Sequence, residues 1–331
     1  MDKSKSYLSR FLKSALLGGI TLFAAQSAQA SGYPAQPINI IVPFQAGGGV
    51  DTMARILAEK LRETLKQNII VQNKPGASGM LGAQYVAKAK PDGYTLLLGS
   101  AGETAINPYI YKEQMRYKPE TDLLPVSLVV RVPNILVVRP SLTVNNVSEL
   151  IALAKQNSAK LTYGTSGVGN PQHLNGELLQ TMSKTEMIHV PYKGAAAQLA
   201  DVAGDNIDMT FVSYAGAAPF IQSNRVKAIA VTSKERLPLA KDLPSIAETQ
   251  GLENYALENW FGLFVPAGTP ADIVDSLHQA TASALQDADL VQRLRELGNE
   301  PGSMTPAEFA QFIKQGSALY KKIIEDADIK M

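Results

Sequence analysis

Two glycine-rich turns are the residues of this sequence best suited to chemistry with an anion. The first turn, Gly47 to Gly49, follows an apolar stretch and precedes a segment with helical spacing. The second, between Thr165 and Asn170, repeats that order of strand, turn and helix. The first turn of a helix carries unpaired N–H groups and the positive end of the helix dipole, and both attract anions. The two turns therefore predict an anion site, although both also fit as ordinary tight connections.

The familiar nucleotide and hydrolase motifs do not match these turns. A dinucleotide fingerprint would need a glycine at Thr52, and no GxxxxGK[ST] loop occurs after residue 30. The nucleophile elbow GxSxG fails because Val168 and Met80 stand where glycine is required. With three histidines and no HExxH motif, we expect no metal, no cofactor and no catalysis.

A small carboxylate is the anion that the turns fit best. Hydrogen bonds to a charged partner contribute about 1.5–3 kcal/mol each, so four or five amides can approach micromolar affinity after association costs. Two turns suggest a ligand with a carboxylate at both ends and no arginine clamp. Asp51 is interpreted as a helix cap whose charge points away from the anion. His173 is interpreted as a ligand contact or, preferably, as a first-turn residue bonded to the backbone, and His189 as packed within a strand.

Residues 1–30 have the pattern of a secretory signal peptide. Four basic residues precede an apolar run from Ala15 to Ala25, and Ala28-Gln29-Ala30 forms an A-x-A cleavage site. The run is too short to span a bilayer. We therefore expect cleavage after Ala30 and export to a bacterial periplasm.

The composition after the leader excludes several classes of protein. No cysteine is present, so packing alone must stabilise an exported fold. The side-chain charges sum to about −2, and no clustered basic surface indicates nucleic-acid binding. No other long apolar segment indicates a membrane-embedded chain.

Short β-branched runs alternate with amphipathic helical patterns, which predicts an α/β fold with sheets covered on both faces, as in parallel folds. The predicted strands are 38–44, 68–73, 94–99, 128–138, 161–164, 188–192, 208–213, 227–233 and 258–266. In the first helix, Met53, Ile56, Leu57, Leu61 and Leu65 recur at helical spacing. After residue 265 we expect helices only.

The segment 126–138 is apolar through Pro133, and a strand interrupted by proline can leave one sheet and enter another. The segment 258–266 can return the chain. We therefore expect a discontinuous lobe 1 of residues 33–131 and 257–331 around a lobe 2 of residues 132–256, with two crossings as a hinge. The alternative is a single large sheet with Pro133 at its edge.

The sequence resembles the Bug family, the substrate-binding proteins of tripartite tricarboxylate transporters. The stretches that carry the resemblance run in order through nearly the whole chain after the leader: YPAQPINIIVPFQAGGGVDTMARILAEKL, NKPGASGMLGAQYVAKAKPDGYTLLLGS, INPYIY, LTYGTSGVGNPQHLNGELL, HVPYKGAAAQLADVAGDNIDMTF, KAIAVTSKERLP and ENWFGLFVPAGTP. The resemblance implies a type II periplasmic-binding-protein fold whose two lobes close over a small organic acid. It also implies a monomer that delivers its ligand to a two-subunit membrane permease.

The family's binding pattern also implies ligand contacts in this sequence. These are Phe44, Ala46, Gly47, Gly48, Ser78, Gly79, Ser100, Ala101, Gly102, Thr165, Ser166, Gly167 and Ser213. Glu103 departs from the family's small or hydroxyl residue; it can repel an acid or meet an ammonium group, and we expect it to face solvent. Lys193 is interpreted either as neutralising a ligand charge or as solvated, and Trp260 as a core residue. The alternatives to a transport receptor are a receptor that presents its ligand to a sensor kinase and an enzyme acting on organic acids.

Overall fold

The fold consists of two β-sheets with helices packed against them, seen in a computed structural model that describes residues 32–156, 160–192, 194–302 and 304–329. The expected signal peptide and its cleavage site at Ala30, together with Lys193, lie outside the described residues. Among the residues that are described, we find no helix with the length and apolar character needed to cross a membrane.

The first sheet has six strands in the order β11-β4-β10-β3-β1-β2. Its strands are β1 (Ile38–Val42), β2 (Ile69–Asn73), β3 (Thr95–Ser100), β4 (Leu123–Val132), β10 (Asn259–Pro266) and β11 (Glu300–Pro301). Strand β1 pairs in parallel with β2 and β3, whereas β10 runs antiparallel to β3 and β4.

The second sheet has five strands in the order β7-β6-β8-β5-β9. Its strands are β5 (Asn134–Val138), β6 (Thr162–Thr165), β7 (Ile188–Pro191), β8 (Met209–Ser213) and β9 (Lys227–Val231). Strand β6 is parallel to β7 and β8, and β5 is antiparallel to β8 and β9.

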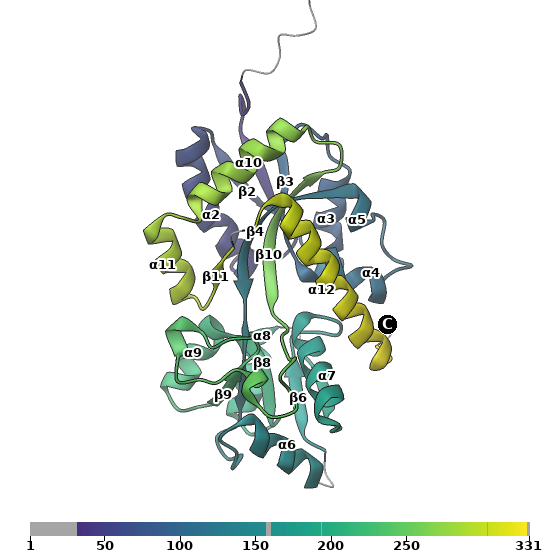
Figure 1. Cartoon of the computed structure of the whole chain (residues 1–331), viewed down its shortest axis with the longest axis vertical. Coiled ribbons are helices and arrows are strands. Elements are labelled where there is room, and N and C mark those ends of the chain that lie inside the picture. The colour runs from purple at the N-terminus through teal and green to yellow at the C-terminus, as the bar shows by residue number, and fades with distance from the viewer. Residues whose placement is uncertain (1–31, 157–159, 193, 303, 330–331) are drawn as a thin grey trace, which may run out of the picture. The chain divides into compact units, whose positions relative to one another are not determined.

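Helices flank each sheet and account for most of the remaining chain (Figure 1). The α-helices are α2 (Gly49–Leu65), α3 (Met80–Ala87), α4 (Asn107–Ile110), α5 (Pro119–Asp122), α6 (Val147–Gln156), α7 (Pro171–Ser183), α8 (Ala195–Ala203), α9 (Tyr214–Gln222), α10 (Ala271–Ala284), α11 (Ala288–Glu296) and α12 (Pro306–Asp326). Short 3₁₀ turns are η1 (Ala77–Gly79), η3 (Pro238–Ala240) and η4 (Ile246–Glu248), and η2 (Gly102–Ile106) is a π-helical segment.

Each strand predicted from the sequence overlaps an observed strand, so the α/β class is confirmed. The sheets are mixed rather than parallel. The chain enters the second sheet through β5 and re-enters the first through β10, and both strands run against their neighbours. The expectation of helices alone after residue 265 is wrong in one respect, because β11 adds a short edge strand against β4.

Pro133 separates the two sheets, because β4 ends at Val132 and β5 begins at Asn134. Proline lacks the N–H that a residue within a central strand donates to its neighbour. Ending the strand at this position therefore sacrifices no backbone hydrogen bond from Pro133. The expected change of sheet at Pro133 is therefore confirmed, and the single large sheet is not formed. The exact lobe boundaries, 33–131 with 257–331 and 132–256, stay a prediction.

The core of the first sheet includes an aromatic cluster around Trp260. The Trp260 ring meets Phe309 edge-on, with ring centroids 5.4 Å apart, and Phe264 and Phe312 lie beside the pair. The expectation that Trp260 is a core residue is confirmed. In α2, the apolar stripe is buried at Met53, Ile56, Leu57 and Leu61.

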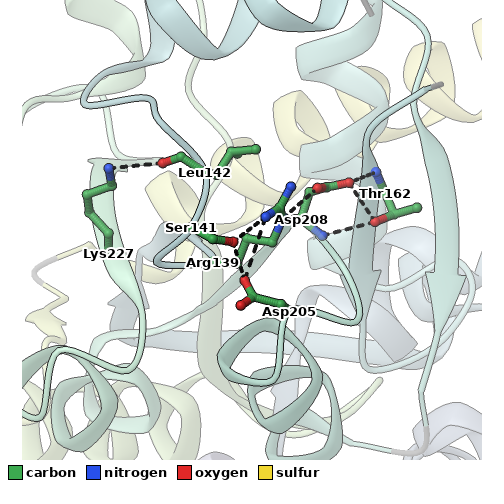
Figure 2. A network of polar contacts seen from close by, with 7 residues as sticks. All are labelled: Arg139, Ser141, Leu142, Thr162, Asp205, Asp208 and Lys227. Atoms are coloured by element: carbon green, nitrogen blue, oxygen red, sulfur yellow. Dashed lines mark hydrogen bonds and ion pairs between the residues drawn. The ribbon is translucent and has the colours of Figure 1, made fainter. Parts of the chain in front are cut away.

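A polar network joins three strands of the second sheet at the end opposite to Asn134, Ser166 and Ser213 (Figure 2). The Asp208 carboxylate accepts hydrogen bonds from Arg139 Nε at 2.9 Å and from Thr162 N and Oγ1 at 2.8 and 2.9 Å. Arg139 follows β5, Thr162 begins β6 and Asp208 precedes β8. The network therefore fixes the register in which the other ends of these strands are presented.

Replacing Asp208 with alanine is expected to lower the free energy of unfolding by about 2 kcal/mol, because three hydrogen bonds to a charged, half-buried acceptor are lost. Urea denaturation of the Asp208→Ala variant measures the loss. Asp205→Asn is the matched control: Asp205 lies in the same network, but it is exposed and 3.7 Å from Arg139, and asparagine keeps an acceptor for Ser141 and tolerates the φ of 59°. Equal losses in the two variants would contradict the role assigned to Asp208.

Candidate functional site

A cleft with a volume of about 860 Å³ lies between chain segments that belong to the two sheets. Its walls are formed at the carboxyl ends of β1, β3, β6 and β8, where ligands of open α/β sheets usually bind. It is lined by Phe44, Gly47, Gly48, Gly49, Val50, Thr52, Met53, Ser78, Ser100, Gly102, Asn107, Val132, Asn134, Ser166, Gly167, Val168, Gly169, Asn170, Pro171, Gln172, Gly194, Ala195, Ser213, Ala215, Gly216, Asn259, Phe261, Leu297 and Asn299.

Four helices begin at this cleft. The residues that precede their first turns all line it: Gly48 before α2, Asn170 before α7, Gly194 before α8 and Ser213 before α9. Only Asn170 caps its helix with its side chain, accepting from His173 N at 2.9 Å. The positive ends of four helix dipoles therefore converge on the cleft, which favours an anion there.

No aspartate, glutamate, lysine, arginine or histidine occurs among the described residues that line the cleft. Polar character comes instead from hydroxyl groups and from carboxamides. The carboxamides are Asn107, Asn134, Asn170, Gln172, Asn259 and Asn299. The described lining therefore attracts negative charge through peptide and side-chain dipoles, with no cationic side chain among its described residues.

Some amides of the glycine turns are already bonded within the protein. Gly47 N donates to Asp51 Oδ2 at 2.9 Å, and Ser166 N donates to Gln172 Oε1 at 2.8 Å. Asp51 is the third residue of α2 rather than its cap, which is Gly48. Burial raises the pKa of Asp51, but hydrogen bonds from Arg55, Gly47 and Asn73 outweigh it and lower that pKa. Asp51 therefore stays charged and paired to Arg55; it does not itself line the cleft, although Gly47, which donates to it, does.

Asn134 is the cleft residue whose hydrogen bonding is incomplete. Its side chain is 4 % exposed, and its Nδ2 has no hydrogen-bond partner among the described residues. Its backbone N donates to Thr232 Oγ1 at 2.9 Å, and it lies opposite Ser213 in the β5–β8 register. A buried N–H group without an acceptor costs about 1–3 kcal/mol, so a ligand oxygen at this position would recover that cost.

A buried polar cluster supports the turn between β6 and α7. His173 Nδ1 accepts from Gly169 N at 3.0 Å, and its ring stacks on His189 with centroids 3.9 Å apart. Burial, and then the neighbouring His173, lowers the pKa of His189 to about 4, so His189 is neutral at pH 7. Thr165 Oγ1 lies 2.6 Å from His189 Nε2 and donates to Gly167 O at 2.8 Å. These side chains shape the turn from behind.

Comparison with known proteins places this chain in a family. The model of the tripartite tricarboxylate transporter family receptor matches residues 53–329. The chain belongs to that family of receptors. Among relatives of this receptor, the UPF0065 protein in the TAR-I ttuE-ttuC' intergenic region of Agrobacterium vitis is 37 % identical over 96 % of this chain and 92 % of its own. BugT of Bordetella pertussis is 32 % identical over 96 % of this chain and 98 % of its own, so the resemblance to Bug proteins is confirmed.

Solved structures share the receptor's fold. Rpa4515 of R. palustris, a structure with adipate, is 36 % identical with a TM-score of 0.81, covering 91 % of this chain and 100 % of its own. MatC of Rhodopseudomonas palustris, with bound malate, is 29 % identical with a TM-score of 0.76, covering 88 % and 100 %. The type II periplasmic-binding-protein fold with two α/β lobes is confirmed.

The receptor's cleft brings together most of the residues named from the sequence. Those that line it are Phe44, Gly47, Gly48, Ser78, Ser100, Gly102, Ser166, Gly167 and Ser213. Those that do not line it are Ala46, Gly79, Ala101, Thr165 and His173. Ala101 and Thr165 are buried, and His173 is bonded to the backbone as its preferred interpretation required. Ligand contact by any of these residues stays a prediction.

Glu103 of the receptor does not face solvent, so that expectation is wrong. Its side chain is 0 % exposed, and its carboxylate accepts from Ser100 N at 2.5 Å and from Ser100 Oγ at 2.6 Å. The spacing Ser100-x-x-Glu103 is that of a capping box, in which the glutamate reaches back to the first residue. That spacing was the signal available in the sequence.

Sequence reasoning missed the carboxamides of the receptor's cleft. Asn107 begins α4, and Asn299 directly precedes β11. Asn134 and Asn259 begin β5 and β10, the strands at the two crossings between the sheets. All four are far from the glycine turns in sequence. Asn134 alone carried a signal, because it follows Pro133 at the expected change of sheet. No metal site was expected from the sequence. The described part of the chain contains no group of three or more His, Cys, Asp or Glu residues that could hold a metal ion.

Proposed function

We propose that this receptor captures a small organic acid in its cleft, in the periplasm, and delivers it to a membrane permease. The observation that carries the proposal is the cleft itself: four helix N-termini open onto it, and the described residues that line it include no charged side chain. Such a site recognises negative charge by fixed dipoles rather than by ion pairs.

The donors of the cleft suit a small acid with a carboxylate at each end. A carboxylate near Gly48 and Thr52 meets the first turn of α2, and one near Ser213 and Gly216 meets the first turn of α9. Hydrogen bonds to a charged group contribute about 1.5–3 kcal/mol each, so four or five of them reach micromolar affinity after the cost of association. Adipate in Rpa4515 and malate in MatC are acids of this kind.

Binding by closure of the two lobes is the mechanism that the contacts favour. Two glycines make close approaches between segments of different sheets: a Cβ on Gly169 would lie 2.4 Å from Ile110 Cδ1, and one on Gly298 would lie 2.5 Å from Tyr214 Cβ. The chain changes sheet at Pro133 and again before Asn259, and we place the hinge at these two crossings. A ligand held by donors from both sheets raises the population of the closed form.

A fluorescence titration tests the proposal. Trp260 is the single tryptophan of the chain, and its neighbours Asn259 and Phe261 line the cleft. Titration of the mature protein with adipate, malate, aspartate, hexanoate and benzoate should change the Trp260 emission for at least one acid with micromolar affinity. Matched amides such as adipamide are the control and should produce no change. Saturable binding of adipamide but of no acid would contradict the proposal.

A further inference from the structure

Glu103 is a buried carboxylate that lies one hydrogen bond away from the cleft. Ser100 lines the cleft, and its hydroxyl donates to Glu103 Oε2 at 2.6 Å. Gly79, which precedes α3, packs against the same side chain: a Cβ there would lie 3.2 Å from Glu103 Oε2. Glu103 forms no ion pair with the described residues, whereas Asp51, the other buried carboxylate beside the cleft, is paired to Arg55 at 3.0 Å.

A structural role as a helix cap does not account for the burial of this charge. Ser245 with Glu248 and Thr305 with Glu308 have the same spacing and form complete capping boxes at the surface, whereas the segment after Ser100 is capped by Ala101 without a side-chain bond. Hydrogen bonds from Arg236 and from the Ser245 backbone lower the pKa of Glu248 to about 2, and those from Thr305 lower the pKa of Glu308. Glu103 differs because it is buried next to the ligand cleft.

The bond to Glu103 decides which hydrogen-bonding group Ser100 presents to the cleft. The serine hydroxyl has one hydrogen and two lone pairs. While the hydrogen is donated to an ionised Glu103, only lone pairs remain, and Gly102 N approaches one of them at 3.3 Å. At this end of the cleft, Ser100 Oγ is then a hydrogen-bond acceptor, and the negative charge of Glu103 lies next to it.

We propose that Glu103 is a specificity-determining residue: when ionised it makes Ser100 accept a hydroxyl or ammonium group of the ligand, and a carboxylate binds there only with uptake of a proton by Glu103. This rests on the proposed capture of an organic acid. The proton stays on Glu103 Oε2, and this O–H donates a hydrogen bond to Ser100 Oγ. The serine hydroxyl then donates its own hydrogen to the ligand carboxylate. One proton is taken from solvent for each carboxylate bound at this end.

The surroundings of Glu103 permit this protonation near neutral pH. Burial raises the pKa of Glu103 to about 7, and the bonds from Ser100 oppose that effect. The titratable group beside it is Tyr117, whose hydroxyl donates to Glu103 O at 2.6 Å and whose pKa lies above its usual value because of burial. Tyr111 faces Ser78 on η1, and Tyr109 on α4 is bonded to Ser317 of α12. The charged groups of the other packed elements, α5 and α12, are exposed or bonded at the surface: Glu120, Asp122, Glu308, Lys314, Lys321, Lys322, Glu325 and Asp326.

Two matched ligands test the proposal. Adipate carries a carboxylate at both ends, and 5-aminopentanoate replaces one of them with an ammonium group on the same chain. Calorimetry at pH 6.5 and 8.5 should show adipate affinity falling by tenfold or more in the wild type, while the affinity for 5-aminopentanoate rises by about fourfold as Glu103 becomes ionised. At pH 8.5, adipate titrations in two buffers of different ionisation enthalpy should report uptake of about one proton.

The variants Glu103→Gln and Glu308→Gln complete the experiment. Glutamine at 103 can accept from Ser100 N and donate to Ser100 Oγ at all pH values, so its adipate affinity should not depend on pH. Glu308→Gln removes a capping-box carboxylate remote from the cleft and should behave as the wild type. If Glu103→Gln does not fold, proton uptake by the wild type decides the question without it.

The outcomes separate the two proposals. Adipate binding that is independent of pH, takes up no proton and is unchanged in Glu103→Gln overturns the role of Glu103 but leaves the capture of organic acids intact. Failure of every acid of the fluorescence panel to bind the wild type and Glu103→Gln at pH 6.5 overturns both.

Discussion

Replacing Asn134 with leucine is expected to weaken adipate binding by at least tenfold while stabilising the ligand-free receptor. Leucine has nearly the shape of asparagine but cannot donate, so the ligand loses one hydrogen bond to a charged group, about 1.5–3 kcal/mol. The ligand-free protein no longer buries an Nδ2 without a partner among the described residues. Its free energy of unfolding should rise by about 1 kcal/mol, since the buried group left unsatisfied is removed. Calorimetry and urea denaturation measure the two effects.

Asn107 provides a matched control for this result. It also lines the cleft and is buried, but its Nδ2 donates to Ser78 O at 2.9 Å. Asn107→Leu should therefore lower the free energy of unfolding by about 1–2 kcal/mol, because the Ser78 carbonyl loses its donor. A stability loss of the same size in Asn134→Leu would mean that the Asn134 side chain is satisfied within the protein.

The elements that position the cleft could be read from local patterns in the sequence. The apolar stripe from Met53 to Leu61 formed α2, and Asn170-Pro171 began α7 with the expected cap. Pro133 marked the change of sheet because its missing N–H interrupts a strand wherever it falls. These features depend on residues a few positions apart, and sequence periodicity reports such distances directly.

The hydrogen-bond partners within the cleft could not be read in the same way. Gly47 N is bonded to Asp51, which is close in sequence, but Asn134 becomes a cleft residue only when β5 pairs with β8 opposite Ser213. Glu103 matched a capping box, and most such glutamates lie at the surface, as Glu308 does. Its burial results from Gly79 packing over it and from β3 lying beneath it, which are contacts between distant segments. The Ser100-x-x-Glu103 spacing indicated the bond between these two residues, but not that the Glu103 carboxylate is buried.

Replacing Glu103 with glutamine should stabilise the receptor progressively as the pH rises. Because the folded pKa, about 7, lies above the usual value of 4.5, the folded state binds more protons than the unfolded state between these two values. The contribution of Glu103 to stability is therefore fully present below about pH 4.5 and is lost as the pH rises through 7. The loss amounts to about 3 kcal/mol at pH 8, at about 1.4 kcal/mol per pKa unit. Glutamine stays neutral and avoids it, so urea denaturation at pH 4.5, 6 and 8 should show a growing advantage of Glu103→Gln.

The surface glutamate at position 308 should show the opposite sign. Its pKa is lowered by hydrogen bonds from Thr305, so its contribution is present above the usual pKa of a carboxyl group and is lost as the pH falls. Glu308→Gln should therefore be less stable than the wild type at pH 8 and similar to it at low pH. Glutamates at the same Ser/Thr-x-x-Glu spacing thus have opposite effects at high pH: Glu308, which is exposed, stabilises the protein, and Glu103, which is buried, destabilises it. If Glu103→Gln followed the pattern of Glu308→Gln, the Glu103 carboxylate would be solvated in the ligand-free protein, and the coupling of its proton to carboxylate binding would be excluded.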